Sequence, residues 1–148
     1  MPFSTKITHK RFSLLPFTPE DMKGIGDAVI KSVQKRILAG IKVDDSQARP
    51  LKGDVKSDKY IPYAEQKVRK GLAGIRNWTW SGKTLKSMQV LSASEDKAVV
   101  GFVGDRANRI VAKMNQIDRM FGVAESDQRA LQDEVQKRIQ SKQYIKLD

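Results

Sequence analysis

The sequence predicts an α+β fold in which a long amphipathic N-terminal helix packs on a small antiparallel β-sheet. Three observations support this prediction. Residues 18–40 repeat apolar side chains with the period of a helix, and residues 78–104 hold two short β-prone runs divided by a polar break. The chain of 148 residues has room for one core, so we expect a single domain, 1–148.

Residues 1–17 form an N-terminal segment that mixes apolar and basic residues without a helical period. Its apolar content is too high for a purely disordered tail. We therefore expect one short strand at 10–15, behind a flexible start.

Residues 18–40 are predicted to be the helix. Thr18 can cap its amino terminus and Pro19 suits the first helical position, while Gly40 suits a left-handed cap at the other end. The apolar residues recur every three or four positions: Met22, Ile25, Val29, Val33 and Ile37. This stripe is expected to cover one face of the sheet.

Residues 43–77 are predicted to be a long loop or arm, with a short helix at 64–72. Connections of this length are uncommon in compact domains and are usually functional or disordered. One interpretation is an arm that docks on another subunit through Tyr60 and Tyr63. The other is a solvated loop, and the composition favours neither.

Residues 78–104 are predicted to be a β-hairpin, with strands at 85–91 and 98–103. Both faces of the second run are apolar, and a strand of that kind is usually covered on both sides. The helix at 18–40 can cover one face. The other face requires a further layer, supplied either by this chain or by a neighbouring subunit.

Four apolar residues of the hairpin segment are candidate structural or interface anchors: Trp78, Trp80, Leu85 and Phe102. Trp78 and Trp80 share one strand face if the segment is extended, because side chains alternate along a strand. Large apolar side chains of this kind dominate both cores and interfaces.

Residues 105–148 are predicted to be a helical C-terminal part. Apolar residues between 105 and 116 indicate a second helix, and Ser126 with Asp127 marks the start of a third. The apolar stripe of the third helix is narrow, so we expect it on the edge of the domain.

Catalytic chemistry is not expected. The chain has no cysteine and a single histidine, His9, which excludes thiolate catalysis and Cys/His zinc sites. The run Ser81-Gly82-Lys83-Thr84 resembles the end of a phosphate-binding loop, but Asn77 occupies the position of its first glycine and the residues that follow are predicted to be β. We therefore expect no enzyme and no catalytic, metal or cofactor site.

The net charge of +11 predicts attraction to nucleic acid or to an acidic protein face. The basic residues are dispersed, and no recognisable nucleic-acid module organises them. A basic nucleic-acid-binding module is the alternative function. No apolar run approaches the roughly 20 residues of a membrane span, and the first residues lack the apolar core of a signal peptide, so we expect no membrane partner and synthesis in a cytoplasm.

The segment 78–88 carries a family resemblance. Its residue types follow the order apolar, Thr, any, Thr or Ser, Gly, two residues, Leu, two residues, Ser or apolar: Trp78-Thr79-Trp80-Ser81-Gly82-Lys83-Thr84-Leu85-Lys86-Ser87-Met88. The order of other features agrees, with Arg49-Pro50-Leu51 upstream and Phe121-Gly122-Val123 downstream. Over about residues 21–139 the chain resembles the tailed-bacteriophage virion morphogenesis or tail completion family and the related head-tail joining and neck proteins.

The resemblance implies a structural, non-enzymatic virion protein. Copies of the chain would form a ring, expected to be a hexamer, at the head-tail junction or the tail end, in a tail completion, neck or tail terminator role. The implied partners are other phage neck, connector or tail-tube proteins, with passive contact to genomic DNA. The implied location is the tail or neck of the virion, after synthesis in the host bacterial cytoplasm.

A ring would supply the missing cover of the hairpin and a docking place for the arm. Its basic surface would face either an acidic partner protein or the DNA that passes through. We prefer the protein, because strong phosphate binding in a channel would retard the DNA.

Overall fold

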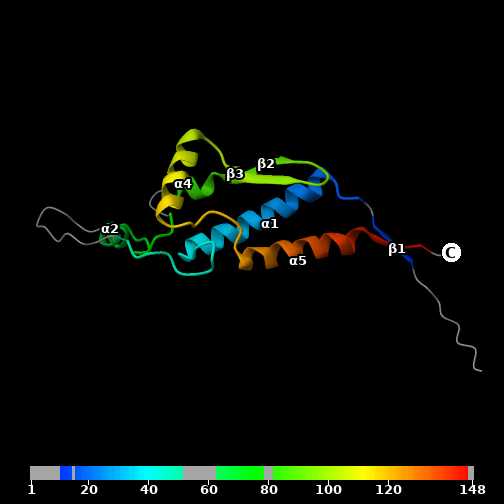
Figure 1. The fold of residues 1–148 in the computed structure, drawn as a ribbon, viewed down its shortest axis with the longest axis horizontal. Helices are drawn as coiled ribbons and strands as arrows, with labels where there is room; N and C mark the ends of the chain where they lie inside the picture. The colour runs from blue at the N-terminus through cyan, green and yellow to red at the C-terminus, as the bar shows by residue number, and fades with distance from the viewer. Residues whose placement is uncertain (1–10, 15, 52–62, 79–81, 147–148) are drawn as a thin grey trace, which may run out of the picture.

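The computed structural model describes residues 11–14, 16–51, 63–78 and 82–146, and for 11–14, 63, 64 and 143–146 it describes the backbone alone (Figure 1). The elements follow one another as β1 (Arg11–Leu14), α1 (Pro19–Leu38), α2 (Tyr63–Arg69), α3 (Lys83–Lys86), β2 (Met88–Ala93), β3 (Ala98–Phe102), α4 (Asp105–Ile117), α5 (Glu125–Lys142) and β4 (Gln143–Lys146).

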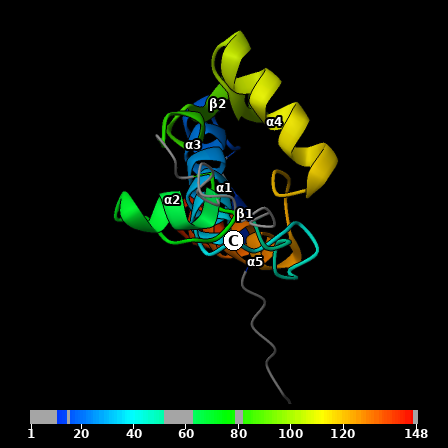
Figure 2. The same ribbon diagram turned by 90° about the vertical axis from the view of Figure 1, so that its left-hand side faces the viewer.

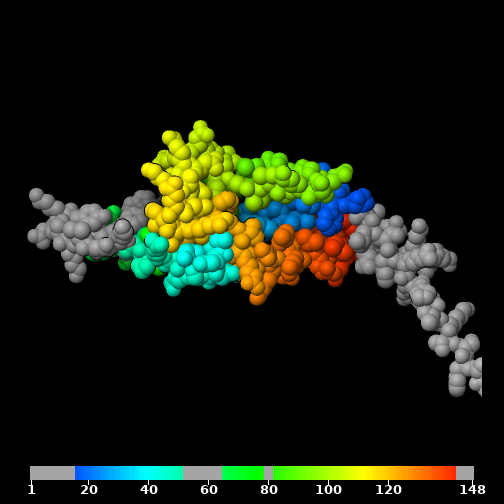
Figure 3. Space-filling model, in the orientation of Figure 1, coloured from blue at the N-terminus to red at the C-terminus, as the bar shows by residue number. Residues whose placement is uncertain are grey.

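Helix α1 lies at the centre of the molecule. The β2–β3 hairpin packs on one side of it and α5 on the other, so that the three form successive layers in the ribbon and the space-filling views (Figures 1 and 3). The predicted α+β fold, with a long N-terminal helix on a small antiparallel sheet and helices after it, is confirmed.

The ends of α1 are set by local chemistry. The hydroxyl of Thr18 accepts the backbone N–H of Asp21 at 3.2 Å, and the Asp21 carboxylate accepts the backbone N–H of Thr18 at 2.8 Å. This reciprocal pair satisfies donors that a helix start would otherwise leave open. At the other end Gly40 has φ +72°, the left-handed conformation that the sequence predicted for it.

The hairpin sits close to α1 because α1 has a glycine at the contact. A Cβ atom built on Gly26 would lie 2.7 Å from a methyl carbon of Val90 and 3.4 Å from one of Val100. Both valines belong to the face of the hairpin that turns towards the helix. The close approach therefore depends on the missing side chain.

A variant of Gly26 and a control variant of Lys31 test the contact between α1 and the hairpin. Gly26→Ala should lower the free energy of unfolding by about 1–3 kcal/mol through overpacking, although alanine is the better helix former. Lys31→Ala, on the exposed side of the same helix, should change it by less than about 0.5 kcal/mol. Denaturant unfolding measures both. An unchanged or raised stability of Gly26→Ala would contradict the close packing.

A buried ion pair joins α1 to α5. The Arg36 guanidinium donates to the Asp127 carboxylate at 2.9 Å, and both side chains are almost completely buried. Arg36 also donates to the carbonyl oxygens of Ile41, Met120 and Gly122, at 2.8, 3.0 and 2.7 Å. It thereby holds the chain that leaves α1 and the loop that enters α5 against the same helix turn.

The Asp127 carboxylate also accepts hydrogen bonds from α1 and from the start of α5. It accepts the hydroxyl of Ser32 at 2.7 Å and the backbone N–H of Ala124 at 2.9 Å. The bond to Ala124 caps the helix, because a carboxylate in the first turn of α5 accepts the backbone N–H of the residue just before the helix. The same residue therefore begins α5 and fixes α5 to α1.

Breaking this pair should be costly. Arg36→Met leaves the Asp127 carboxylate buried without its cation and should destabilise the fold by about 3–5 kcal/mol. Arg129→Met removes an exposed i,i+4 pair with Glu125, at 4.0 Å, and should change stability by no more than about 0.5 kcal/mol. Thermal and denaturant unfolding of both variants give the comparison, and equal stabilities would contradict the role of Arg36.

Asp21 ties the start of α1 to the end of α5. Its carboxylate contacts Lys142 Nζ at 2.6 Å and an Arg138 guanidinium nitrogen at 3.3 Å. The hydrogen bond from Lys142, followed by that from the backbone N–H of Thr18, holds the pKa of Asp21 well below its ordinary value of 3.8. The folded chain therefore favours the ionised form of this carboxylate.

The lowered pKa predicts an acid dependence of stability. The contribution of Asp21 is present above the unfolded pKa and is lost as the pH falls from about 4 through the folded pKa. The difference in Tm between the native chain and Asp21→Asn should thus be constant above about pH 5 and shrink below about pH 4. Calorimetry on both proteins between pH 2 and 7 measures this difference in Tm. An equal difference at pH 2 and at pH 7 would show that the ionisation of Asp21 does not stabilise the fold.

The hairpin is shorter than predicted, because residues 83–86 form the helical turn α3 instead of a strand. Gly82 begins the turn with φ +70°, and the Ser87 hydroxyl closes it by donating to the carbonyl oxygen of Thr84 at 2.7 Å. Pairing of the two strands starts only where the N–H of Val103 donates to the carbonyl oxygen of Ser87, at 3.0 Å. The expectation that β structure directly follows the Ser81-Gly82-Lys83-Thr84 run is therefore wrong.

Trp78 is not in a strand either. Its φ of +59° lies in the left-handed region, which costs a residue with a Cβ atom about 1–3 kcal/mol. The prediction that it shares a strand face with Trp80 is thus wrong for Trp78, and Trp80 lies outside the described residues.

The described parts of the middle segment pack on the body of the chain. The predicted short helix is confirmed as α2. The N–H of Ala48 donates to the carbonyl oxygen of Gly40 at 2.8 Å, and the Asn77 side chain donates to that of Leu38 at 3.1 Å. The described residues 43–51 and 72–77 are thus attached to the carboxyl end of α1, while 44–47, 49 and 50 are exposed.

The remaining elements are close to those predicted. The strand at 10–15 is confirmed as β1, and the two C-terminal helices are confirmed as α4 and α5. The pairing of β1 with β4, with Arg11 opposite Lys146, forms a second two-stranded sheet from the two ends of the chain and was not predicted. Helix α5 also packs along α1 (Figure 1), a closer association than its narrow apolar stripe indicated.

Candidate assembly surface

In the described part of the chain, the β2–β3 hairpin is covered on one side only. Its inner side buries Met88 and Phe102, and Val90 and Val100 pack against that core. The opposite side is what we call the outer hairpin face. Its apolar residues are Leu91, Val99, Gly101 and Val103, and the three larger side chains are 51%, 36% and 47% exposed. The exposed, uncharged Gln89 and Ser92 lie opposite Gly101 and Val99 on the same face.

Leu91 points away from α1 because it follows the inward-facing Val90 in the strand, and a bulge follows it. The strand register shifts between Val90 and Ser92, which leaves Leu91 without a partner on β3. Its side chain instead lies across Gly101, where an added Cβ atom would meet Leu91 Cδ1 at 2.8 Å. Gly101 thus allows an exposed leucine to lie flat over the strand, which widens the apolar surface.

The hairpin strands carry no charge. Neither β2 (MQVLSA) nor β3 (AVVGF) contains a charged residue, in a chain of which 30% is charged. The charges of the hairpin lie in its turn, where Ser94 closes the loop by pairing its N–H with the carbonyl oxygen of Lys97 at 2.7 Å. The outer hairpin face is therefore largely apolar and neutral.

The two strands also have unpaired edges. Within the described part of the chain β2 pairs only with β3, so each strand leaves one row of backbone N–H and C=O groups without a ladder partner. An isolated two-stranded sheet is marginal on its own, and open edges readily accept a further strand. Chemically, this surface suits another protein chain.

Three of the sequence-predicted anchors lie together in the core. Trp78, Leu85 and Phe102 are only 7%, 6% and 4% exposed. The ring centroids of Trp78 and Phe102 are 6.0 Å apart, and Phe121 meets Phe102 edge-on at 4.6 Å. These residues are structural anchors of a single chain and offer little surface to another one.

The other predicted interface residues are not placed. Tyr60 and Trp80 lie outside the described residues, and Tyr63 is described only as the backbone start of α2. Leu91 is a surface residue that the sequence did not reveal, because a leucine within a predicted strand can lie on either face, and only the inward orientation of Val90 shows that Leu91 points outwards. The double apolar character of 98–103, by contrast, did indicate the outer hairpin face in advance.

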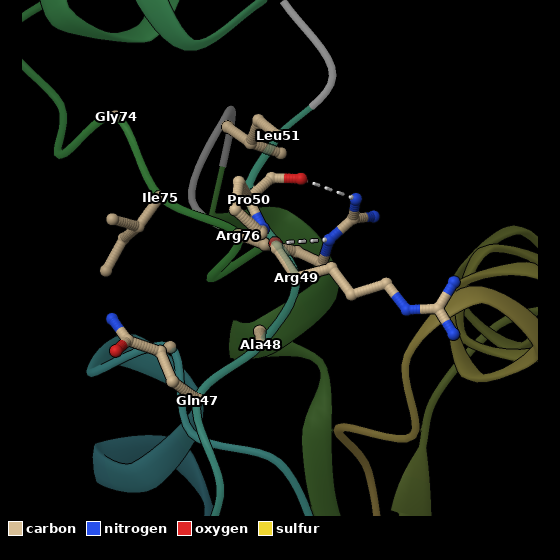
Figure 4. Close-up of a pocket in the computed structure, with 9 residues that line it drawn as sticks. Gln47, Ala48, Arg49, Pro50, Leu51, Gly74, Ile75 and Arg76 are labelled. Atoms are coloured by element: carbon tan, nitrogen blue, oxygen red, sulfur yellow. Dashed lines mark hydrogen bonds between the residues drawn. The ribbon is translucent and has the colours of Figure 1, made fainter.

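Apart from the hairpin, a hollow of about 510 Å³ lies beside the carboxyl end of α1 (Figure 4). It is lined by Gly40, Gln47, Ala48, Arg49, Pro50, Leu51, Gly74, Ile75 and Arg76. The buried Asp118 carboxylate accepts the backbone N–H of Arg49 at 2.8 Å and pairs with the guanidinium groups of Arg49 and Arg76 at 3.5 and 3.3 Å.

Arg76 also reaches the carbonyl oxygens of Arg49 and Pro50, at 3.3 and 3.5 Å, as the dashed lines of Figure 4 show. The polar groups of Arg76 and Asp118 are therefore occupied by the chain itself. This cluster attaches the segment after Ala48 to the loop after α4, and it presents no nucleophile or general base.

Lys67 is a buried amine. Its Nζ donates to the side-chain oxygen of Asn77 at 2.6 Å and to the carbonyl oxygen of Ile75, and burial lowers its pKa. Both acceptors are amide oxygens of the loop that Asn77 attaches to α1. Lys67 thus fastens α2 to that loop.

Within the described ranges no three His, Asp or Glu side chains come together to hold a metal ion. None of the helices in those ranges is both long enough and apolar enough to cross a membrane. Comparison with protein-family models, with curated proteins and with solved structures finds no match.

Proposed function

We propose that this protein is a structural subunit of a tailed-bacteriophage virion, which assembles with copies of itself into a ring at the head-tail junction or the tail end. The observation that carries the proposal is the outer hairpin face, which a single chain leaves uncovered. The resemblance of residues 78–88 to phage morphogenesis proteins supplies the virion context.

Charge favours this face as the place where copies meet. Each chain carries a net charge of +11, so copies repel one another across most contacts. The uncharged strands of the hairpin avoid that repulsion, and the exposed Glu95 and Asp96 of its turn offer negative charge to a basic neighbour. An apolar, neutral patch with an acidic tip therefore suits a second copy of a basic chain.

The contact must extend beyond the apolar side chains. A stable interface buries about 800 Å² on each partner, more than three half-exposed side chains provide. The free edges of β2 and β3 supply the remainder, if a neighbouring chain adds a strand or lies along the edge.

The symmetry of the assembly depends on whether the outer hairpin face of one copy contacts the same face or a different surface of the next copy. When the hairpin of one copy meets another surface of the next copy, the arrangement is head-to-tail, and it forms a ring when the rotation between successive copies closes. The number of copies, six, is taken from the resemblance. The other neck, connector or tail-tube proteins would then meet the ring on its two open sides.

The outer hairpin face gives a direct test. Leu91→Asp combined with Val99→Asp should abolish self-association and incorporation into particles, because it places charge on an apolar contact. Helix content and Tm should change little, since both side chains are exposed in the single chain. Light scattering at low and high salt measures association, and complementation of a phage lacking the gene measures incorporation.

Ile117→Asp is the matched control. Ile117 is 50% exposed, as Leu91 is, but it lies at the end of α4 away from the hairpin. It should assemble as the native chain does. Normal assembly of the hairpin variant, or a native chain that stays monomeric at every salt concentration and in the presence of particles, would overturn the proposal.

A further inference from the structure

Helix α4 carries three cationic side chains along its exposed side. Arg106, Arg109 and Lys113 are all exposed, and at 100° per residue they fall within an arc of about 60° and span about 10 Å along the axis. Ala107 and Val111 are buried on a different side of the helix. We call these three cations the α4 stripe.

Helix α4, which carries the stripe, lies apart from the two long helices. Figure 2 shows α4 standing apart from α1 and α5, and in Figure 3 it forms the raised yellow part of the surface. Because its three side chains are exposed, the stripe is not covered by the other helices.

Among the described residues the cations of the stripe are unpaired, whereas three of the four cations on α5 are paired. On α5 the basic residues Arg129, Arg138 and Lys142 each contact a carboxylate within 4.0 Å. No ion pair involves any residue of the α4 stripe in the described part of the chain. Asp105 is the one carboxylate of α4, and it borders the same surface hollow as Arg109 without pairing with it.

The positive surface continues onto the neighbouring helical turn. Lys83 of α3 and Arg106 of α4 line one hollow of about 210 Å³, together with Gly104 between them. The tertiary structure thus places Lys83 and Arg106, which are 23 positions apart in the sequence, beside one hollow.

The surroundings of the stripe favour phosphate over an acidic protein. Between Arg106 and Lys113 the other exposed residues are Asn108 and Ala112, which give no aromatic or large apolar anchor. Protein interfaces generally depend on such anchors, whereas a phosphate backbone requires only positioned cations and donors. Single strands are held mainly by stacking aromatics, and the stripe presents none.

We propose that the α4 stripe binds the phosphate backbone of duplex nucleic acid without reading its sequence. The inference rests on the charges and exposure of α4 and stands whether or not the chain is a ring subunit. Three phosphate contacts predict weak binding, with log K falling against log salt at a slope of about −3. Such binding is weak enough to let a duplex slide past.

The test uses fluorescence anisotropy of a labelled duplex DNA, about 30 base pairs long, with the purified full chain. The native protein should bind at 50 mM salt with the slope given above. Arg106→Glu combined with Arg109→Glu and Lys113→Glu should weaken binding at least tenfold and remove most of the slope. Unchanged circular dichroism and Tm show that the variant remains folded.

A charge-matched control separates the stripe from net charge. Lys23→Glu with Lys31→Glu and Lys35→Glu makes the same change in total charge on the exposed side of α1, where Asp27 lies among the lysines. This variant should keep most of the affinity and the native salt slope. Equal losses in the two triple variants would overturn the proposal.

A different polyanion distinguishes the kind of partner. If the native chain fails to bind the duplex but binds polyglutamate, and the α4 variant loses that binding, the stripe serves an acidic protein and the nucleic-acid assignment is wrong. If it binds single-stranded DNA more tightly than the duplex, the preference for a duplex is wrong.

Discussion

The fold depends on one buried ion pair. Arg36, near the end of α1, and Asp127, in the first turn of α5, meet at 2.9 Å in the interior. The remaining donors of Arg36 hold backbone oxygens of the segments on either side, so a single guanidinium fixes where the chain leaves α1 and where it enters α5. Because buried charges are tolerated only when they are paired and hydrogen-bonded, a shift of the two helices that separates Arg36 from Asp127 is unfavourable.

With α1 fixed between α5 and the hairpin, the hairpin can be covered on one side only. Gly26 lets its inner side lie close to the helix, and the other side is left to Leu91, Val99 and Val103. With Leu91 lying across Gly101, this side is a largely apolar surface without charge. The same packing that completes the core thereby produces the surface on which we base the proposed assembly.

Charge is distributed as unevenly as hydrophobicity. Three of the four cations of α5 contact carboxylates, and Arg49 and Arg76 share Asp118, while the hairpin strands carry no charge. Within the described residues the exposed cations of α4 have no such partners. Part of the net charge of +11 therefore lies on an open basic helix next to uncharged strands, and the two surfaces adjoin where Arg106 and Val103 line one hollow.

The sequence by itself determined what depends on near neighbours. The cap at Thr18, the period of α1, the left-handed Gly40 and the two apolar faces of 98–103 could be predicted because each is a relation between residues a few positions apart. Only the tertiary structure decided the rest. The sequence does not show that Arg36 is paired with Asp127, 91 positions away. It also does not show that Leu85 and Phe102 are buried in one core. Such choices rest on burial and on partners distant in the chain, and local propensity carries no information about either.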